Sequence, residues 1–454
     1  MSSTCVKVLL RWPPTSVRIR TRIAASAFGL VAITAYLPVA AANEVVKWND
    51  SAVRAVGAGG QNPIQATRTI AMVQGAVHDA LNAIKPRYLS YYYEAPADSE
   101  AHPDAAIAAA ARVVLLGVVP GHGSAAQKQA STAMVEESYG KAVGAISDSP
   151  AKTRGLAIGR ASGEAMLLLR QNDGAGTSAP YTPSRTPGRW RPTPNPDPAN
   201  PPIADAKAAL GFAPSNLPGW GNVTPFALLS QAQYWLPGPP AMSSAAYARD
   251  YNEVKGLGGQ VSTARTPEQE QIARFWYEGP GSWYRVTRTV AETRRFDEWD
   301  SARMLALVAM AMADSFIAGW KIRYVYDSWR PVTAIREGDT DGNDATVADP
   351  KWSSLQNTPN VSDYPSTQSV FSAAAATVIT GVIGTDKVDF ETASGPPFAG
   401  IKRSFTGLSQ AARESADSRV YAGIHTRSAC DDGLLLGRQI GQRVAAQFLL
   451  PTRR

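Results

Sequence analysis

Apolar residues recur three and four positions apart over most of this chain, the spacing that places them on one face of an α-helix. The pattern is clearest in TRTIAMVQGAVHDALNAI and in AAIAAAARVVLLGV. No segment shows a convincing strand alternation or a repeat of fixed period, so the pattern indicates an all-α fold. It predicts helices at residues 67–84, 105–118, 127–139, 151–171, 244–257, 267–277, 286–296, 298–328, 366–383 and 433–450.

The composition changes between residues 172 and 240, where Pro, Gly, Trp, Thr and Asn dominate. We interpret this stretch as an ordered loop region and not a flexible linker, because Trp190, Trp220 and Phe226 need apolar surroundings. It divides the chain into an N-terminal helical half, residues 43–240, and a C-terminal helical domain, residues 241–454. We therefore expect two packed helical bundles.

The first 42 residues have the pattern of an export signal. Basic positions end at Arg22, an apolar stretch runs over residues 23–37, and small residues follow at 40–42. A retained membrane anchor is the alternative, since residues 23–42 could just span a bilayer. The Ala-rich content and the small-residue end favour cleavage after Ala42. We expect a secreted or periplasmic protein without membrane association, because no later stretch looks long and apolar enough to span.

The formal net charge of +7 is concentrated in the same N-terminal segment. The first 42 residues contain five basic and no acidic residues, so the remainder holds 40 basic and 38 acidic residues. A nearly neutral mature chain gives no electrostatic reason to expect nucleic-acid binding. Cys5 lies in the leader and leaves Cys430 alone, which excludes an intrachain disulfide and a cysteine-based zinc site in the mature chain.

Three short segments in the last third carry candidate chemistry: RYVYDSWRP at residues 323–331, YPSTQS at 364–369 and SRVYAGIH at 418–425. If the predicted helix continues through the first segment, Arg323 and Arg330 lie within about 20° of each other on one face. Two guanidinium groups on one face repel unless an anion or carboxylates lie between them. Surface arginines paired with acidic residues are the alternative.

The other two segments add groups that suit an oxyanion. Ser366 is placed as a cap or first-turn residue of the next helix, where free backbone N–H groups bind anions. Arg419 can clamp an oxyanion with two N–H groups. His425 offers a ring nitrogen as a nucleophile or a metal ligand. Each of these signals is weak alone, whereas His78, in the amphipathic run at 67–84, is expected to be a buried structural residue.

Together and in this order, the segments resemble the signature of the vanadium haloperoxidase and type 2 phosphatidic acid phosphatase (PAP2) superfamily. That signature is Lys, six residues, then Arg-Pro; Pro-Ser-Gly-His; and Ser-Arg, five residues, then His. The similarity extends over about residues 45–446, and the fold it implies is all-helical with two bundles. Further runs resemble the bacterial haloperoxidase branch: WRPTP at Trp190, VTPFAL at Val223, EQEQIARFW at Glu268 and WRPVTAIREGD at Trp329.

The resemblance implies a pocket for vanadate, or for phosphate in the phosphatases. Substrates would be hydrogen peroxide and halide, or a phosphate ester. By similarity, the oxyanion is held by the guanidinium groups of Arg323, Arg330 and Arg419, the hydroxyl of Ser366 and the backbone N–H of Thr367. His425 would be the axial ligand to vanadium, or the nucleophile that accepts phosphate.

The sequence departs from the family pattern at three of these positions. Arg323 stands where the family has Lys, which keeps the charge but changes its shape. Thr367 replaces Gly, a mild change if only its amide is used. Gln368 stands at the position of the family's acid–base His, and an amide cannot exchange a proton near pH 7. Loss of a general acid–base group typically costs about 10²–10⁴-fold in rate.

Ala429 also stands where an Asp often orients the axial His, and Asp431 or Asp432 are the candidates to replace it. Three hypotheses therefore stay open. The first is a vanadate-dependent, haloperoxidase-like oxidoreductase impaired by Gln368. The second is an acid phosphatase that acts through a phosphohistidine at His425. The third is a non-catalytic oxyanion-binding protein. The sequence leaves the halide and the oligomeric state, a homo-oligomer included, open.

Overall fold

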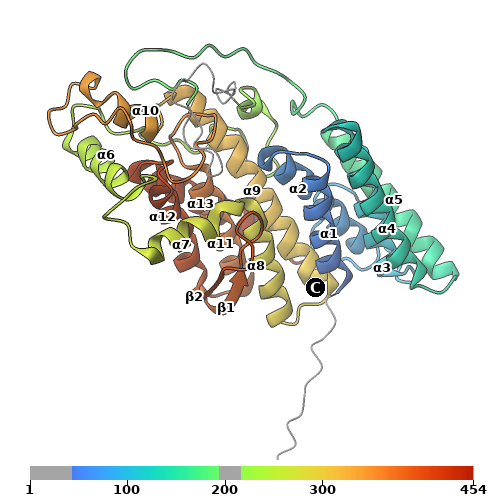
Figure 1. Cartoon of the computed structure of the whole chain (residues 1–454). Coiled ribbons are helices and arrows are strands. Elements are labelled where there is room, and N and C mark those ends of the chain that lie inside the picture. The colour runs from blue at the N-terminus through green and yellow to red at the C-terminus, as the bar shows by residue number, and fades with distance from the viewer. Residues whose placement is uncertain (1–42, 194–215, 453–454) are drawn as a thin grey trace, which may run out of the picture. The chain divides into compact units, whose positions relative to one another are not determined.

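Helices make up most of the computed structural model, which describes residues 43–193 and 216–452, all within one compact unit (Figure 1). The predicted all-α class is therefore confirmed, while the leader at residues 1–42 lies outside the described residues and stays a prediction. The α-helices are α1 Glu44–Ala58, α2 Pro63–Asn82, α3 Pro103–Val118, α4 Ala125–Gly144, α5 Pro150–Arg170, α6 Ala245–Leu257, α7 Pro267–Phe275, α8 Pro280–Thr293, α9 Glu298–Tyr326, α10 Pro331–Arg336, α11 Thr367–Ile383, α12 Leu408–Tyr421 and α13 Arg427–Gln447.

Side-chain caps decide where many of these helices begin. The side chain of Asn62 accepts from backbone N–H groups in the first turn of α2, with Pro63 at the first helical position. Ser124 and Thr266 form capping boxes at α4 and α7. At its other end, α9 stops where Asp327 adopts a left-handed conformation (φ 50°). The caps of α2 and α4 explain why these two helices begin before their predicted starts, whereas α7 begins at Pro267 as predicted.

The long helix α9 forms the centre of the core. Nearly every residue from Ser301 to Trp320 is buried, so this helix is surrounded by protein on all sides. It packs against α2 of the N-terminal helices and against α11 and α13 of the C-terminal helices. Figure 1 shows α9 between these two sets. The two packed bundles are thus confirmed, while the division at residue 240 stays a prediction.

Two described helices are long and apolar enough to cross a membrane by length and composition alone: Pro103–Gly121, where α3 continues into a short 3-10 turn, and α9. The sequence-based expectation that no such stretch follows the leader was therefore wrong. The apolar window of α9 is 94% buried and that of Pro103–Gly121 is 56% buried. Burial of this extent is typical of a core helix, because the apolar surface is already covered by protein.

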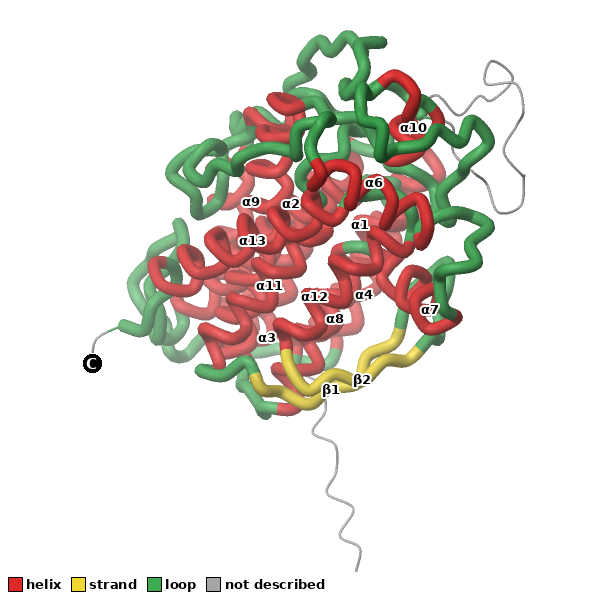
Figure 2. Tube along the Cα trace, turned by 90° about the vertical axis from the view of Figure 1, so that its left-hand side faces the viewer, coloured by secondary structure: helices red, strands yellow, loops and turns green. Residues whose placement is uncertain are grey.

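An antiparallel hairpin, absent from the sequence-based prediction, connects α11 to α12. Strand β1 (Lys387–Ala393) pairs with β2 (Lys402–Gly407), with Phe390 opposite Phe405 (Figure 2). The inward residues of β1 alternate with exposed ones over only seven positions, which is too short for a clear period of two in the sequence. Helices α1, α10 and α12 were missed as well. In α12 the buried face consists largely of Ala and Ser, which carry little hydrophobic signal.

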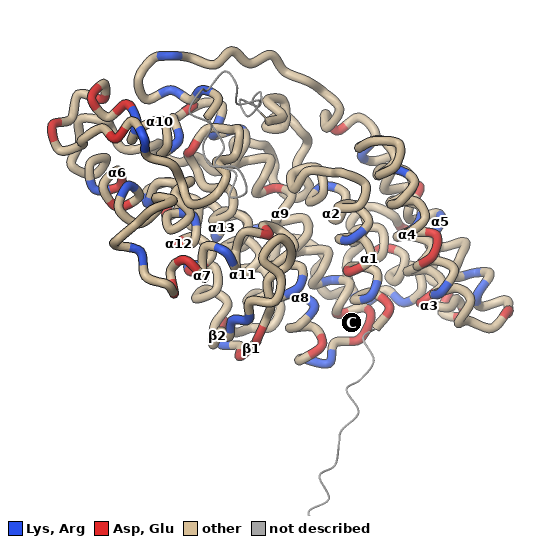
Figure 3. Tube along the Cα trace, viewed as in Figure 1, with Lys and Arg blue, Asp and Glu red and all other residues tan. Residues whose placement is uncertain are grey.

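Charged residues of both signs are interspersed along the described trace (Figure 3). Many of them form ion pairs at the surface, such as Arg112 with Glu136 and Lys402 with Glu391. Surface pairs of this kind contribute little to stability. The buried arginines described below are a different case, because they lie away from solvent.

Candidate functional site

Residues from four helices and one loop meet at one cavity of about 240 Å³. Arg323 lies in the last turn of α9, and Arg330 is the N-cap of α10. Thr367 and Gln368 begin α11, Arg419 lies near the end of α12, and His425 follows in the loop before α13. The structure thus brings together six of the seven side chains that the sequence singled out, since all six line this cavity.

Ser366 does not line the cavity. It is the N-cap of α11, as expected, and its Oγ accepts hydrogen bonds from Ser369 Oγ at 3.0 Å and from Ser369 N–H at 3.4 Å. Its own backbone N–H donates to the carbonyl of Ala429 at 2.9 Å. The residue is completely buried. In this structure Ser366 therefore fixes the start of α11, and its hydroxyl, which accepts from Ser369, keeps its own proton to donate.

The expectation that Arg323 and Arg330 share one helix face was wrong. Helix α9 ends at Tyr326, and the left-handed Asp327 turns the chain before Arg330 begins α10. The two side chains still converge because backbone carbonyls hold them. Arg323 Nη1 donates to the carbonyl of Ser362, and Arg330 donates from Nε to the carbonyl of Val361. Arginine suits both positions, because its five N–H groups can bind backbone carbonyls of the loops and an anion at the same time.

Several hydrogen-bond donors in this cavity are buried and have no protein partner. They are Arg323 Nε, Arg330 Nη2, Arg419 Nε, Arg419 Nη1 and the hydroxyl of Thr367. The three arginines are 2%, 0% and 8% exposed, respectively. Buried donors are normally satisfied, because an unmade hydrogen bond costs about 1–3 kcal/mol and more for a charged group. A tetrahedral oxyanion has the charge and the acceptor atoms to satisfy all five donors.

Burial also shifts the titration of these guanidinium groups. It lowers the pKa of Arg323 and of Arg419 to about 10. The pKa of Arg330 falls well below its ordinary value, because of burial first and the nearby charge of Arg323 second. The lowered pKa values mean that three positive charges held close together in this buried cavity destabilise the folded state. An anion in the cavity would reduce this destabilisation, which is consistent with an oxyanion-binding site.

His425 is 3% exposed and is held by the carboxylate of Asp363, with Nδ1 2.7 Å from Asp363 Oδ1. Arg330 Nη1 lies 3.0 Å from Nε2 and 3.3 Å from Nδ1. Because the Asp363 carboxylate accepts at Nδ1, that nitrogen carries the ring proton, and Nε2 of the neutral ring carries none. Burial and the three neighbouring arginines hold the pKa of His425 well below its ordinary value. The ring is therefore neutral and presents an Nε2 lone pair, as a ligand or a nucleophile requires.

Asp363 was missed by the sequence-based reasoning, which named Asp431 or Asp432 as the group that orients His425. Both candidates were wrong, because Asp431 pairs with Arg413 and Asp432 accepts from the hydroxyl of Tyr364. Asp363 also accepts from Thr426 Oγ1 at 2.7 Å, which fixes its second oxygen. Burial raises the pKa of Asp363, while Arg330 acts in the opposite direction. The one sequence signal was its place directly before the YPSTQS segment.

Gln368 is anchored at the edge of the cavity. Its Nε2 donates to the carbonyl of Trp276 at 2.8 Å and to Ser415 Oγ at 3.3 Å. The Trp276 carbonyl can only accept, so this contact also determines which end of the amide is nitrogen. Ser372 continues the network from Ser415. The side chain at this position is therefore well fixed, but it has no acidic proton to donate.

The remaining walls of the cavity are mainly apolar. Ile64, Phe316, Trp320, Val361 and Phe371 line it, and all are at least nine-tenths buried. The cavity thus combines the polar motif residues with apolar walls. A cavity of this kind suits a small charged group held by a few converging donors and open to small reactants.

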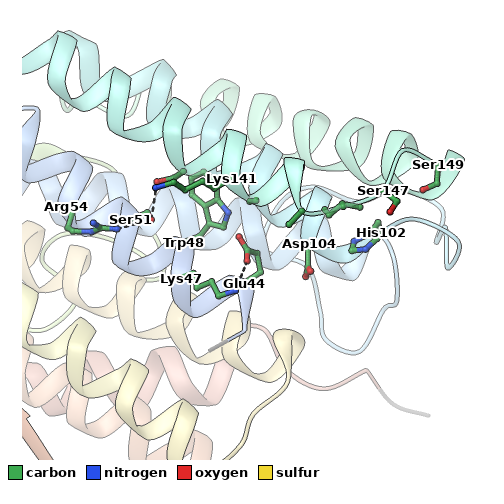
Figure 4. Close-up of a pocket in the computed structure, with 14 residues that line it drawn as sticks. Glu44, Lys47, Trp48, Ser51, Arg54, His102, Asp104, Lys141, Ser147 and Ser149 are labelled. Atoms are coloured by element: carbon green, nitrogen blue, oxygen red, sulfur yellow. Dashed lines mark hydrogen bonds and ion pairs between the residues drawn. The ribbon is translucent and has the colours of Figure 1, made fainter. Parts of the chain in front are cut away.

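A second hollow of about 710 Å³ lies between α1, α4 and the start of α3 (Figure 4). Its polar groups pair with one another, as in the contacts of Lys47 with Glu44 and of Ser138 with Ser51. Lys47 and Lys141 are more than half exposed. None of the motif residues lies there. His102 Nδ1 is buried there without a partner. The charged groups of the groove are solvated or paired, whereas the cavity around His425 gathers unpartnered donors from three buried arginines.

Comparisons with known proteins agree with this geometry. Residues 303–450 match the family model of the vanadium chloroperoxidase second helical-bundle domain. Vanadium chloroperoxidase of Curvularia inaequalis is 27% identical over 219 residues, which is 40% of this chain and 35% of that protein. The matched region thus spans about a third of the length of this curated relative.

Two solved structures share the fold over most of the chain. The structure of a bacterial vanadium-dependent iodoperoxidase superposes with a TM-score of 0.74 at 24% identity, covering 90% of this chain and 97% of that one. The apo form of a bacterial vanadium-dependent chloroperoxidase gives a TM-score of 0.67 at 17% identity, covering 84% and 91%. The chain therefore shares its fold with bacterial vanadium haloperoxidases, and residues 303–450 are similar to the second helical-bundle domain of that group.

Proposed function

We propose that this chain is a vanadate-dependent haloperoxidase that oxidises halide with hydrogen peroxide. The observation that carries the proposal is the set of buried, unpartnered donors on Arg323, Arg330 and Arg419 around the Nε2 lone pair of His425. A tetrahedral oxyanion satisfies both features at once, since it accepts hydrogen bonds and offers a central atom to the ring nitrogen.

The chain's own residues have separable tasks in this proposal. The three arginines bind the oxygens of vanadate, and the Thr367 hydroxyl adds a neutral donor. His425 would hold the vanadium through Nε2, and Asp363 would keep that nitrogen free of a proton by holding the ring through Nδ1. Bound vanadate supplies a Lewis-acidic centre that activates hydrogen peroxide toward halide. The apolar walls formed by Phe316 and Phe371 limit the water that reaches this end of the cavity.

Gln368 is expected to lower the turnover rate in this proposal. Halide oxidation by peroxide consumes one proton for each hypohalous acid released, and Gln368 has none to give. Turnover is therefore expected to fall below that of relatives with His at this position, unless another group supplies the proton. Iodide is the most easily oxidised halide to include in a test, and one of the structural relatives is described as an iodoperoxidase.

The test is halide oxidation by the purified chain with hydrogen peroxide and iodide or bromide, with and without orthovanadate. We expect activity that requires vanadate, is lost in His425→Ala and is kept in His122→Ala, a matched control in a glycine-flanked turn away from the cavity. A phosphate-ester hydrolysis assay runs beside it. Hydrolysis without halide oxidation would instead indicate a phosphatase acting through His425, and silence in both assays would indicate a non-catalytic oxyanion-binding protein.

A further inference from the structure

The turn after α7 forms one wall of the oxyanion cavity. Its consecutive residues Tyr277 to Pro280 all line the cavity. This turn is tied to α11, because Gln368 Nε2 donates to the carbonyl of Trp276 at 2.8 Å. Gln368, the residue at the position of the family's acid–base His, thus binds the backbone carbonyl of Trp276. This hydrogen bond holds the peptide group directly before Tyr277 against Gln368.

The Tyr277 ring lies between a packing partner and the cavity. It makes a T-shaped contact with Phe398 at 5.4 Å between ring centroids, and the residue is only partly buried. Burial lowers the pKa of Arg419, and Tyr277 is one of two neighbouring groups that act against this shift. The phenol therefore lies close to one of the three arginines that face the oxyanion. The residue as a whole is partly exposed to solvent.

The other groups on the cavity wall are poor proton donors. Glu278 accepts two hydrogen bonds from Arg285 and one from the backbone N–H of Gly395, the pattern of an ionised carboxylate. The Nδ1 proton of His425 is engaged with Asp363. Guanidinium groups remain protonated at neutral pH and donate hydrogen bonds without releasing protons.

Three neutral polar side chains remain to be compared with Tyr277. The amides of Gln368 and Asn216 have no exchangeable acid proton near pH 7. The hydroxyl of Thr367 is an aliphatic alcohol, which is a far weaker acid than a phenol. Among the described residues that line this cavity, the Tyr277 hydroxyl is therefore the group best suited to release a proton and regain it from water.

We propose that Tyr277 is the catalytic proton donor of this site and performs the task that Gln368 cannot. The inference rests on the proposed haloperoxidase function. Halide attacks one oxygen of the peroxide, the O–O bond breaks, and its electron pair moves to the second oxygen. That oxygen takes the proton from Tyr277 Oη and leaves as water. Halide is oxidised by two electrons to hypohalous acid, peroxide is reduced, and the phenolate recovers its proton from solvent.

The test compares the full-length wild type with Tyr277→Phe, which removes the hydroxyl and keeps the ring against Phe398. Tyr139→Phe on α4 is the matched control. Two quantities are measured: kcat for iodide oxidation, and the Kd for orthovanadate by calorimetry without peroxide or halide. We expect kcat to fall by about 10²–10⁴-fold in Tyr277→Phe, Kd to change by less than about threefold, and Tyr139→Phe to match the wild type. Adding Gln368→His to Tyr277→Phe should restore most of the lost rate.

The outcomes separate a failure of the proton-donor role of Tyr277 from a failure of the haloperoxidase proposal. If the wild type oxidises halide in a vanadate-dependent way and Tyr277→Phe does so at the same rate, Tyr277 is not the donor, whereas the haloperoxidase proposal stands. A Kd that weakens by the same factor as kcat makes Tyr277 a binding group and overturns the proton-donor role. If the wild type shows no vanadate-dependent oxidation but binds vanadate, the haloperoxidase proposal fails and this inference fails with it.

Discussion

Replacing Arg419 with Met should stabilise the protein without ligand and abolish tight oxyanion binding. Arg419 Nε and Nη1 are buried and have no hydrogen-bond partner. Burial lowers the pKa of this guanidinium to about 10, against an ordinary value of about 12.5, and each pH unit corresponds to about 1.4 kcal/mol. Keeping the charge in the folded state therefore costs about 3 kcal/mol. Met has a similar length and no charge, so removing this cost should raise the free energy of unfolding by about 2–3 kcal/mol.

The same change should weaken vanadate binding. Two hydrogen bonds from a charged donor are worth about 3 kcal/mol or more together, which corresponds to at least about a 100-fold rise in Kd. Urea unfolding in phosphate-free buffer measures the first effect, and calorimetric titration with orthovanadate measures the second. Arg413→Met is the control on the same helix, since Arg413 is half exposed and pairs with Asp431; it should change stability by less than about 1 kcal/mol. If Arg419→Met is destabilised, or binds vanadate as the wild type does, Arg419 has a structural role and the reasoning is wrong.

Three further predictions concern Asp363, His78 and the effect of bound vanadate on stability. Asp363→Asn should weaken vanadate binding by about 10–100-fold, because the ring of His425 loses the carboxylate that orients it; calorimetry should show Asp432→Asn unchanged. Burial lowers the pKa of His78 to about 4, so the unfolded chain takes up a proton at higher pH than the folded one. About 3 kcal/mol of stability should therefore be present above pH 6.5 and lost as pH falls toward 4, and urea unfolding of His78→Gln should show a flatter pH profile. Finally, vanadate at 100 times its Kd should raise the free energy of unfolding by about 2.7 kcal/mol; an unchanged thermal midpoint at saturation would contradict specific binding.

Much of the fold could be predicted from the sequence because its buried helices carry large apolar side chains at helical spacing. Helices α2, α3 and α9 were found in this way, although α9 and most of α2 are buried on every side and not on one face. Helix α12 escaped because Ala and Ser form its buried face. Strand β1 escaped because its alternation covers seven residues only. Burial by neighbours, and not local pattern, decides these two elements.

The candidate site, like the fold, could be predicted from the sequence only in part. The motif resemblance identified Arg323, Arg330 and Arg419, and the structure places them on one cavity with His425. Asp363 could not be found by helical spacing, because it lies in a loop whose course depends on contacts such as its backbone N–H to the carbonyl of Ser328. The prediction of a shared helix face failed for a local reason, namely the turn that interrupts the chain after Tyr326.

Tyr277 illustrates a second kind of signal that the sequence does not provide. It is far from the three motif segments along the chain, and it lies on the cavity wall in the turn whose Trp276 carbonyl binds Gln368. The residue that departs from the family pattern thus also anchors the turn that presents a phenol. This link depends on tertiary packing of α7 against α12, which no local pattern specifies.

The most direct test of the central claim is a crystal structure of the protein soaked with orthovanadate. The account predicts vanadium bonded to His425 Nε2, with its oxygens accepting hydrogen bonds from Arg323, Arg330 and Arg419 at the donors that have no protein partner. Vanadate bound elsewhere, or no vanadium in this cavity at a concentration that saturates binding in solution, would contradict it.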